Sequence, residues 1–232
     1  MTFPAGFTTI GEGAFGGCTG LTSLTFPEGL TTIGEGAFQG CTGLTSLTFP
    51  AGPTGLTTIG ALAFECCTGL TSVTFPAGLT SIGVHAFFGC TGLTSLTFPP
   101  CLTTIRRWTF QLCTGLTSVT FAEGLTTIEE GAFSLCTGLT SVTFPEGLTN
   151  IGIGAFYGCA SLTFPEGLTT IGECAFYECD TGEAFNNDWS VLISEFYAEY
   201  STPNLDELER PISVPNKARV VGCRTGGAGA GL

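Results

Sequence analysis

The sequence predicts a repeat solenoid that is mainly β-structure, and three observations lead to this fold class. A single pattern recurs along most of the 232 residues, at a spacing of 23 residues from Phe15 to Phe38. Apolar and polar residues alternate over a short stretch of each copy, and prolines and glycines return at fixed places. Self-similarity at such a period is typical of stacked coils, so the chain is not expected to form one or two ordinary globular domains.

A phenylalanine marks each copy of the pattern and sets the period. The spacing widens to 26 residues between Phe38 and Phe64 and shortens to 20 between Phe156 and Phe176, and both changes fall where the repeat turns. The marker residues are Phe15, Phe38, Phe64, Phe87, Phe110, Phe133, Phe156 and Phe176.

The second copy shows which elements each repeat should contain. Alternation with period two directs Leu24 and Phe26 inward and their neighbours outward, which predicts a strand that Pro27 ends. Residues 30–33 predict a second short extended segment, and residues 34–40 a tight turn or single helical turn. Burying about seven apolar side chains at roughly 2 kcal/mol each does not balance the entropy of ordering one repeat. The repeats must therefore stack to be stable.

The string LTSLTFPEGLTTIGEGAFQGC resembles the BspA-like, or Treponema-type, leucine-rich repeat. The resemblance covers residues 1–179. It implies a right-handed leucine-rich-repeat superhelix with a parallel, concave sheet along one side and short turns or helical turns between strands. It further implies a role in surface display, adhesion or protein recognition, and it brings no catalytic residues.

Cysteine follows the marker phenylalanine by three residues in every copy. Stacking should place these thiols about 4.8 Å apart, a distance that also permits disulfides between neighbours; a ladder of free, buried thiols is the preferred interpretation. Free thiols and a start without a signal peptide favour a reducing intracellular compartment, whereas the resemblance implies the cell surface. The eight residues are Cys18, Cys41, Cys67, Cys90, Cys113, Cys136, Cys159 and Cys179.

Composition argues against several functional classes. The net charge is −13 with six Lys and Arg, which disfavours nucleic acid as a partner, and no apolar run approaches the roughly 20 residues of a membrane span. The glycines of residues 11–16 match a nucleotide-binding pattern but recur at the same turn in other repeats. His85 and the pair Glu129 and Glu130 are interpreted as surface residues, and no metal or cofactor site is expected. We therefore expect a protein that is not an enzyme.

One sharp break in the pattern is a candidate contact site for another protein. Arg106, Arg107 and Trp108 replace the Gly-Glu-Gly of other copies. Arginine and tryptophan are enriched at binding hot spots. Drift in a tolerant turn is the alternative interpretation.

The outward strand positions are a second candidate for partner binding. Serine and threonine occupy them in successive copies and should form a two-column lattice of hydroxyl groups. Their structural value in strands is the alternative, and an adhesive or ice-binding surface is a less favoured one, because a curved sheet would not match ice. The candidate threonines are Thr48, Thr74, Thr97, Thr120 and Thr143.

After Cys179 the pattern stops, and residues 180–210 predict a helical segment. Trp189, Phe196 and Tyr200 fall on one apolar stripe of an amphipathic helix. This helix would either cap the solenoid or dock into a partner. Residues 211–232 predict an extended or flexible tail.

Taken together, these features predict a non-catalytic protein-recognition or scaffold module of the leucine-rich-repeat type. The alternative is a permanent, peripheral subunit of a larger assembly, held by an uncapped N-terminal edge or by the C-terminal helix. Another protein is the expected partner in both cases.

Overall fold

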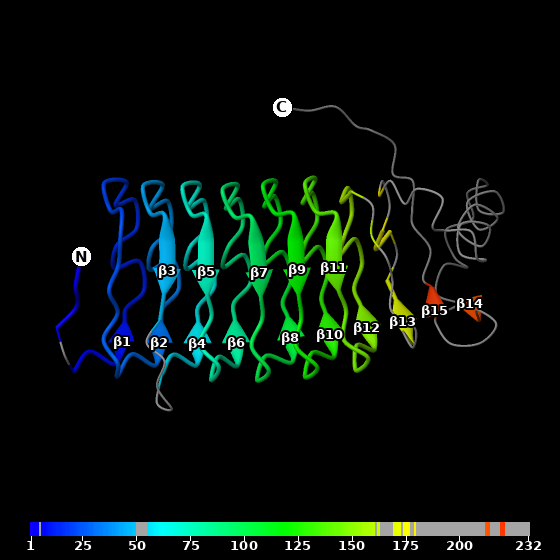
Figure 1. Cartoon of the computed structure of the whole chain (residues 1–232), viewed down its shortest axis with the longest axis horizontal. Coiled ribbons are helices and arrows are strands. Elements are labelled where there is room, and N and C mark those ends of the chain that lie inside the picture. The colour runs from blue at the N-terminus through cyan, green and yellow to red at the C-terminus, as the bar shows by residue number, and fades with distance from the viewer. Residues whose placement is uncertain are drawn as a thin grey trace.

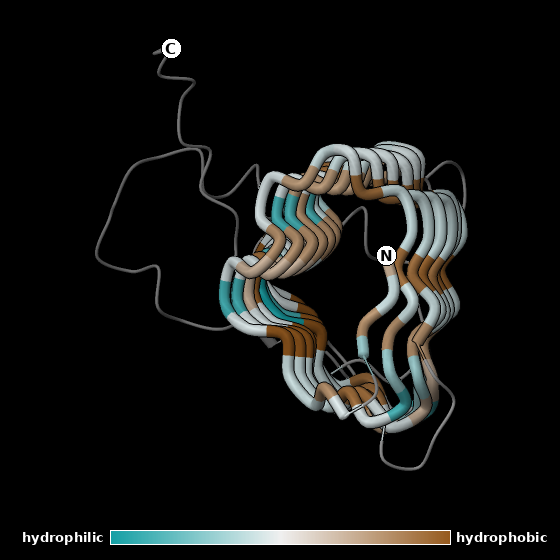
Figure 2. The backbone as a smooth tube through the Cα atoms, turned by 90° about the vertical axis from the view of Figure 1, so that its left-hand side faces the viewer, coloured by the Kyte–Doolittle hydropathy of each residue, from teal (hydrophilic) through white to brown (hydrophobic). Residues whose placement is uncertain are grey.

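The computed structural model describes residues 1–4, 6–49, 55–160, 162, 169–172, 174–176 and 179, together with the backbone of residues 212–213 and 219–220. The repeats form coils that lie side by side in a nearly straight row (Figure 1). Viewed from the end of the row, successive coils superpose around a common interior (Figure 2). This arrangement confirms the predicted β-solenoid. We number the coils by their marker phenylalanine, so coil 1 contains Phe15 and coil 8 contains Phe176.

One side of the solenoid is built by two-residue strands that each end in a buried isoleucine. Neighbouring strands pair in parallel and in register, Ile33 with Ile59 for example. The predicted second extended segment is therefore confirmed. The strands are β1 (Thr9–Ile10), β2 (Thr32–Ile33), β4 (Thr58–Ile59), β6 (Ser81–Ile82), β8 (Thr104–Ile105), β10 (Thr127–Ile128), β12 (Asn150–Ile151) and β13 (Thr170–Ile171).

A second side is built by three-residue strands with a buried central residue between an outward Ser and an outward Thr. Isolated bridges from Thr2 to Thr25 and from Ser23 to Ser46 extend the same pairing into the first coils. Leu24 and Phe26 are buried, as the alternation predicts. The strands are β3 (Ser46–Thr48), β5 (Ser72–Thr74), β7 (Ser95–Thr97), β9 (Ser118–Thr120) and β11 (Ser141–Thr143).

The segment that carries the marker phenylalanine consists of consecutive tight turns and not of a helical turn. In coil 2 the N–H of Gln39 donates to the carbonyl of Gly36 at 3.1 Å, and the N–H of Cys41 donates to the carbonyl of Phe38 at 3.2 Å. Gly36 and Gly40 have positive φ angles of 58° and 69°. A left-handed residue in every turn prevents the chain from continuing as a right-handed helix.

Aromatic rings fill the interior in two columns. The marker phenylalanines stack face to face with ring centroids 5.2–5.3 Å apart and planes within 3–14° of parallel. A second column, which includes Phe98 and Phe121, lies beside it, and Phe98 contacts Phe110 edge to face at 5.4 Å. These stacked and edge-to-face contacts each add roughly 0.5–1.5 kcal/mol to the burial of the rings. The core is therefore continuous from coil to coil.

The predicted cysteine ladder is present as free thiols. From coil 2 onward each thiol donates to the carbonyl of the marker phenylalanine one coil back, as Cys90 does to Phe64 at 3.1 Å. Burial raises the pKa of these thiols, and that of Cys67 reaches about 12. Cys174, which lies outside the ladder, is disulfide-bonded. The expectation of free thiols in the ladder is thus confirmed.

Beyond coil 8 the structure describes two further strands. β15 (Arg219–Val220) pairs in parallel with β13, and β14 (Ile212–Ser213) pairs antiparallel with β15. Residues 180–210, which the sequence predicts to be helical, lie outside the described residues. The regular elements of the described part are strands, so the C-terminal helix and the handedness of the superhelix stay predictions.

Candidate recognition surfaces

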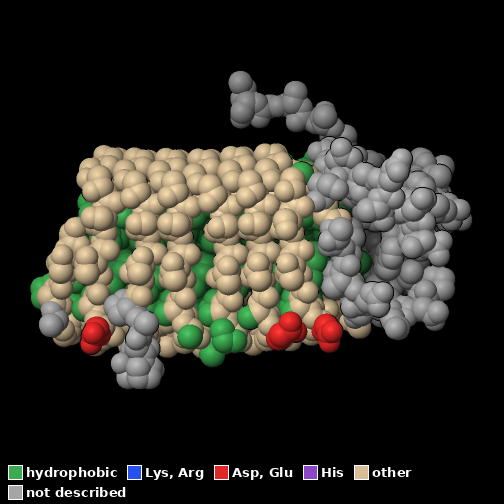
Figure 3. All heavy atoms as spheres, viewed as in Figure 1, with side chains coloured by type: hydrophobic (Ala, Val, Ile, Leu, Met, Phe, Trp, Pro, Cys, Tyr) green, Lys and Arg blue, Asp and Glu red, His purple; other side chains and the backbone are tan. Residues whose placement is uncertain are grey.

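The strands β3, β5, β7, β9 and β11 carry the predicted lattice of hydroxyl groups, which we call the hydroxyl face. The register within each sheet places like residues opposite one another, Thr48 beside Thr74 and Thr97 beside Thr120. Backbone and uncharged polar side chains make up most of this face, with hydrophobic side chains visible between them, and the acidic side chains in the same view lie along its lower edge (Figure 3). The five candidate threonines, all exposed to solvent, are Thr48, Thr74, Thr97, Thr120 and Thr143.

A neighbouring column of threonines differs in what its hydroxyl groups do. The hydroxyl of Thr71 donates to the carbonyl of Thr45 at 3.0 Å, and that of Thr117 donates to the carbonyl of Thr94 at 3.0 Å. Side chains in this column thus reinforce the backbone ladder between coils. Among the described residues, the outward Thr74 and Thr97 make no such bond, so their hydroxyl groups remain available to solvent or to a partner.

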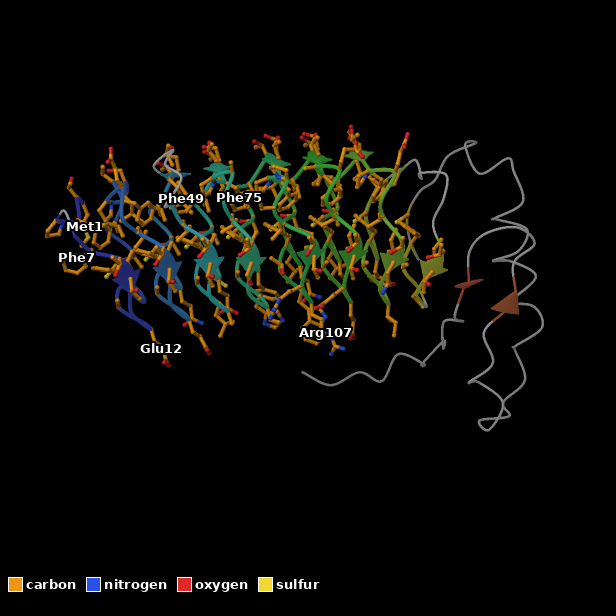
Figure 4. The ribbon with its side chains drawn as sticks, turned by 90° about the horizontal axis from the view of Figure 1, so that it is seen from below. Met1, Phe7, Glu12, Phe49, Phe75 and Arg107 are labelled. Atoms are coloured by element: carbon orange, nitrogen blue, oxygen red, sulfur yellow. The ribbon has the colours of Figure 1, made fainter. Side chains whose placement is uncertain are left out.

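The second surface is the line of turns that precedes the marker phenylalanines. We define the turn ridge as two consecutive residues from each of coils 1 to 7, the second of which has a positive φ angle in every one of them. Glu12 and Arg107 project from it on the same side of the solenoid (Figure 4). In coil order the residue pairs are Glu12-Gly13, Glu35-Gly36, Ala61-Leu62, Val84-His85, Arg107-Trp108, Glu130-Gly131 and Ile153-Gly154.

A ladder of backbone hydrogen bonds makes the turn ridge regular. The N–H of Gly36 donates to the carbonyl of Ala61 at 2.8 Å, and the N–H of Leu62 donates to the carbonyl of Val84 at 3.0 Å. The N–H of Trp108 continues the ladder to Glu130 at 3.0 Å. Ridge side chains are therefore held at the strand spacing of about 4.8 Å.

Trp108 lies across the next coil of the ridge. Its φ angle is 54°, a left-handed conformation that is uncommon for a large side chain. The indole packs directly over Gly131, where an added Cβ atom would overlap the ring. On the other side His85 contacts the indole, with ring centroids 5.2 Å apart, and His85 also contacts Phe88 at 5.3 Å. Trp108 and His85 are both half-buried, which leaves part of each ring exposed.

Arg106 and Arg107 provide the positive charge beside this aromatic group. Arg107 forms an ion pair with Glu130, with Nη1 and Oε2 3.6 Å apart, and its side chain is 57% exposed. The backbone N–H of Arg107 also donates to the carboxylate of Glu129 at 3.1 Å. Arg106 is exposed and has no ion pair among the described residues. The two are the only Lys or Arg side chains that the structure describes, in a chain of net charge −13.

Of the sequence candidates, the structure brings Arg107 and Trp108 together with His85 and Glu130, while the candidate threonines lie on a different face. Trp189, Phe196 and Tyr200 lie outside the described residues. Sequence reasoning did not single out Leu62, Val84 or Ile153 as parts of one surface with Trp108. Alignment of the repeats does indicate this surface, because the equivalent positions in other copies hold Gly-Glu-Gly, which is typical of an exposed turn.

The described part of the chain gives little support for a nucleotide-binding or metal site. Residues 11–16 lie in the turn of coil 1, and the glycines there accommodate the turn rather than precede a helix. No group of His, Cys, Asp or Glu side chains within the described residues is placed to hold a metal ion. A search of the same residues finds no helix of the length and hydropathy needed to cross a membrane.

The parallel coils, the ladders and the absence of a described helix define a β-solenoid repeat protein. The family model of the BspA type leucine rich repeat region matches residues 1–114, 57–183 and 160–215 with six copies. The chain belongs to this family, as the resemblance of its repeat predicts.

Solved structures agree with this assignment. A leucine-rich repeat protein from T. pallidum is 30% identical, with a TM-score of 0.64, over 68% of this chain and 75% of that one. One from Bacteroides ovatus is 26% identical, with a TM-score of 0.56, over 77% of this chain and 53% of that one. This chain thus spans about half of the Bacteroides protein. No curated protein sequence matches the chain.

Proposed function

We propose that the chain is a non-catalytic recognition module that binds another protein through its turn ridge. The observation that carries the proposal is the group formed by Arg106, Arg107, Trp108 and His85, which are exposed or half-buried on one edge of a rigid solenoid. Tryptophan and arginine dominate the binding energy of protein interfaces, whereas serine and threonine contribute little. Family membership supports a binding or scaffold role of the same kind.

Rigidity strengthens the case for the ridge. A side chain that is already ordered loses little conformational entropy on binding, and ordering one long side chain costs about 0.5–1.5 kcal/mol. Contacts with Gly131 and His85 hold the indole of Trp108, and the exposed Arg107 lies 3.6 Å from Glu130. The ridge thus presents a preorganised aromatic and cationic patch.

The test compares two sets of substitutions in the full chain. A ridge variant combines Arg106→Gly, Arg107→Glu and Trp108→Gly, which restores the sequence of coil 2. A face variant combines Thr74→Ala, Thr97→Ala and Thr120→Ala. Proteins cross-linked to the wild-type chain in its native source should also be captured by the face variant and be lost with the ridge variant. Equal capture by the wild-type chain and the ridge variant would refute this function.

A second candidate is a permanent subunit of a larger assembly, and the exposed apolar side chains of coil 1 favour it. Met1 and Phe7 are each 49% exposed, and Phe15 is only partly buried. A partner stacked on β1 would cover all three. Size-exclusion chromatography with light scattering separates the two candidates. A folded, soluble particle supports the recognition module, and aggregation of the isolated chain supports the subunit.

A further inference from the structure

The turn ridge has a charge and shape pattern that complements itself when it is reversed. Read from coil 2 to coil 5, its residue pairs are Glu35-Gly36, Ala61-Leu62, Val84-His85 and Arg107-Trp108. The acidic end carries a glycine, the basic end carries the largest side chain, and the two middle coils carry apolar or aromatic residues. A second copy running antiparallel would present the same row in the opposite order.

We propose that the partner of the turn ridge is a second copy of this chain, joined through a two-fold axis between coil 3 and coil 4. In this register Glu35 of each copy meets Arg107 of the other. Trp108 faces coil 2, whose buried Gly36 carries no side chain of its own. The proposal rests on the ridge being the recognition surface and identifies its partner. A two-fold contact of this kind closes on itself, since the same patch serves on both chains.

The regular ridge allows these contacts to form together. Both copies have the same spacing of about 4.8 Å per coil. When one coil of the first copy lies opposite a coil of the second, the neighbouring coils of both copies are therefore aligned as well. The three-residue insertion between coils 2 and 3 does not disturb the register, because β2 still pairs with β4, Thr32 beside Thr58. In the sequence the insertion precedes β4, whereas the ridge residues follow β4.

The two neighbouring registers of the same antiparallel pairing fit less well. An axis through coil 4 places Glu35 against Glu130 and leaves Arg107 opposite Ala61. An axis through coil 3 pairs Arg107 with Glu12 but places Glu35 against Val84. The favoured register also brings Glu12 near Glu130, a like-charge approach that the two-fold axis likewise repeats twice. It lies at the rim, where solvent screens it, and Glu130 is already paired with Arg107 at 3.6 Å.

The contact should be weak and dependent on concentration. Six coils extend about 29 Å along the axis at the strand spacing, and a single ridge of that length belongs with the smallest specific interfaces. We therefore expect self-association in the micromolar range. The pairing of Glu35 with Arg107 occurs twice across the axis, so each charge reversal acts at two places.

A charge-swap experiment on the full chain tests the proposal by sedimentation equilibrium. Arg107→Glu and Glu35→Arg should each weaken self-association by roughly tenfold or more, because each places like charges together twice. An equimolar mixture of the two variants should associate as strongly as the wild-type chain, since both contacts are then complementary. Both side chains are exposed, so both variants should fold, as circular dichroism would show.

Glu146→Arg is the matched control, because it makes the same change in charge on an exposed turn away from the ridge. It should leave self-association unchanged. A wild-type chain that stays monomeric at hundreds of micromolar, or a mixture of variants that fails to associate, overturns the homodimer. Loss of a different cross-linked partner from the ridge variant would still support the recognition function in that case, so the two proposals can fail separately.

Discussion

The hydroxyl face and the turn ridge are built on the same coils, yet one is uniform and the other is varied. On the hydroxyl face every described strand repeats an outward Ser and Thr. On the ridge the first residue of each pair changes from coil to coil. From coil 2 to coil 6 it is Glu35, Ala61, Val84, Arg107 and Glu130. Both lie on backbone ladders of similar regularity. Scaffold geometry therefore does not dictate the variation, and the ridge is where this chain differs from a simple repetition of its own pattern.

This difference indicates that side chains in the two regions have different roles. Threonines beside the face bond to the preceding coil and maintain the stack, as Thr71 does to Thr45. Ridge side chains instead contact one another, as His85 and Trp108 do, and the ladder beneath them is formed by backbone alone. Substitutions should consequently change stability on one side and recognition on the other.

The largest expected effect concerns the thiol ladder on which both surfaces depend. Burial raises the pKa of Cys67 to about 12 and that of Cys179 to about 11, from an ordinary value of 9.0. In the unfolded chain these thiols ionise near their ordinary pKa, while in the folded chain they stay protonated. Their contribution to stability is therefore fully present below about pH 9 and is lost as the pH rises toward 12.

Each buried thiol should cost roughly 1.4 kcal/mol per pH unit in this window, and Cys90, Cys113 and Cys136 behave alike. Urea unfolding at pH 8, 9 and 10 measures the free energy of unfolding. A drop of several kcal/mol between pH 9 and 10 is expected, with a shallower slope for Cys113→Ala. An unchanged free energy over this range would contradict the role of the ladder.

A second prediction compares two glycines of the ridge. Gly131 and Gly154 have φ angles of 58° and 57°, so alanine at either should cost about 1–2 kcal/mol in the left-handed region. Only at Gly131 does the added methyl group also overlap the indole of Trp108, which should add roughly 1–3 kcal/mol. Thermal unfolding and the fluorescence of Trp108 should therefore change more for Gly131→Ala. Equal losses would mean that the indole does not rest on Gly131.

Trp108→Gly separates recognition from stability. The substitution relieves a left-handed side chain, a gain of about 1–2 kcal/mol, and removes ring contacts of comparable value. The free energy of unfolding should therefore stay within about 1 kcal/mol of the wild-type chain, while binding through the ridge is lost. A large loss of stability would instead assign Trp108 to the scaffold.

The smallest effect is expected within the threonines. Thr71→Val removes a hydroxyl that donates to Thr45 at 3.0 Å and should cost about 0.5–1.5 kcal/mol. Thr74→Val is the matched control, because the Thr74 hydroxyl is exposed and makes no described hydrogen bond. Its free energy of unfolding should barely change. If both variants lose the same stability, the distinction between the two threonine columns is wrong.

Much of the fold could be predicted from the sequence, because its determinants are local and repeated. Alternation at Leu24 and Phe26 gives the inward face of one strand, and the recurring isoleucine gives the other ladder. The sequence alone does not distinguish a tight turn from a helical turn in residues 34–40. Left-handed residues decide it, and in coil 5 Trp108 and Leu112 take the left-handed conformation where coil 2 has glycines.

The ridge was predicted only in part, since its members come from different coils. Arg106 to Trp108 stand out as a break in the pattern of one repeat. Their contacts with His85 and Glu130 depend on the lateral register of three coils, which no single repeat encodes. Residues 180–210 pose a different difficulty, because a single amphipathic stripe does not determine what it packs against.

The hydrogen-bond ladders also determine which insertions and deletions the solenoid can accept. Because strands and turns of every coil are hydrogen-bonded at fixed positions, a duplication or loss of one whole coil preserves each contact of the stack. A shift of one residue within a coil would turn its apolar side chains outward. The insertion falls between β3 and β4 in the sequence, outside the residues that pair in these strands. Unequal recombination in steps of a full repeat is thus a low-cost route to new sequences of ridge residues, and each such event would alter which coils face each other across a partner.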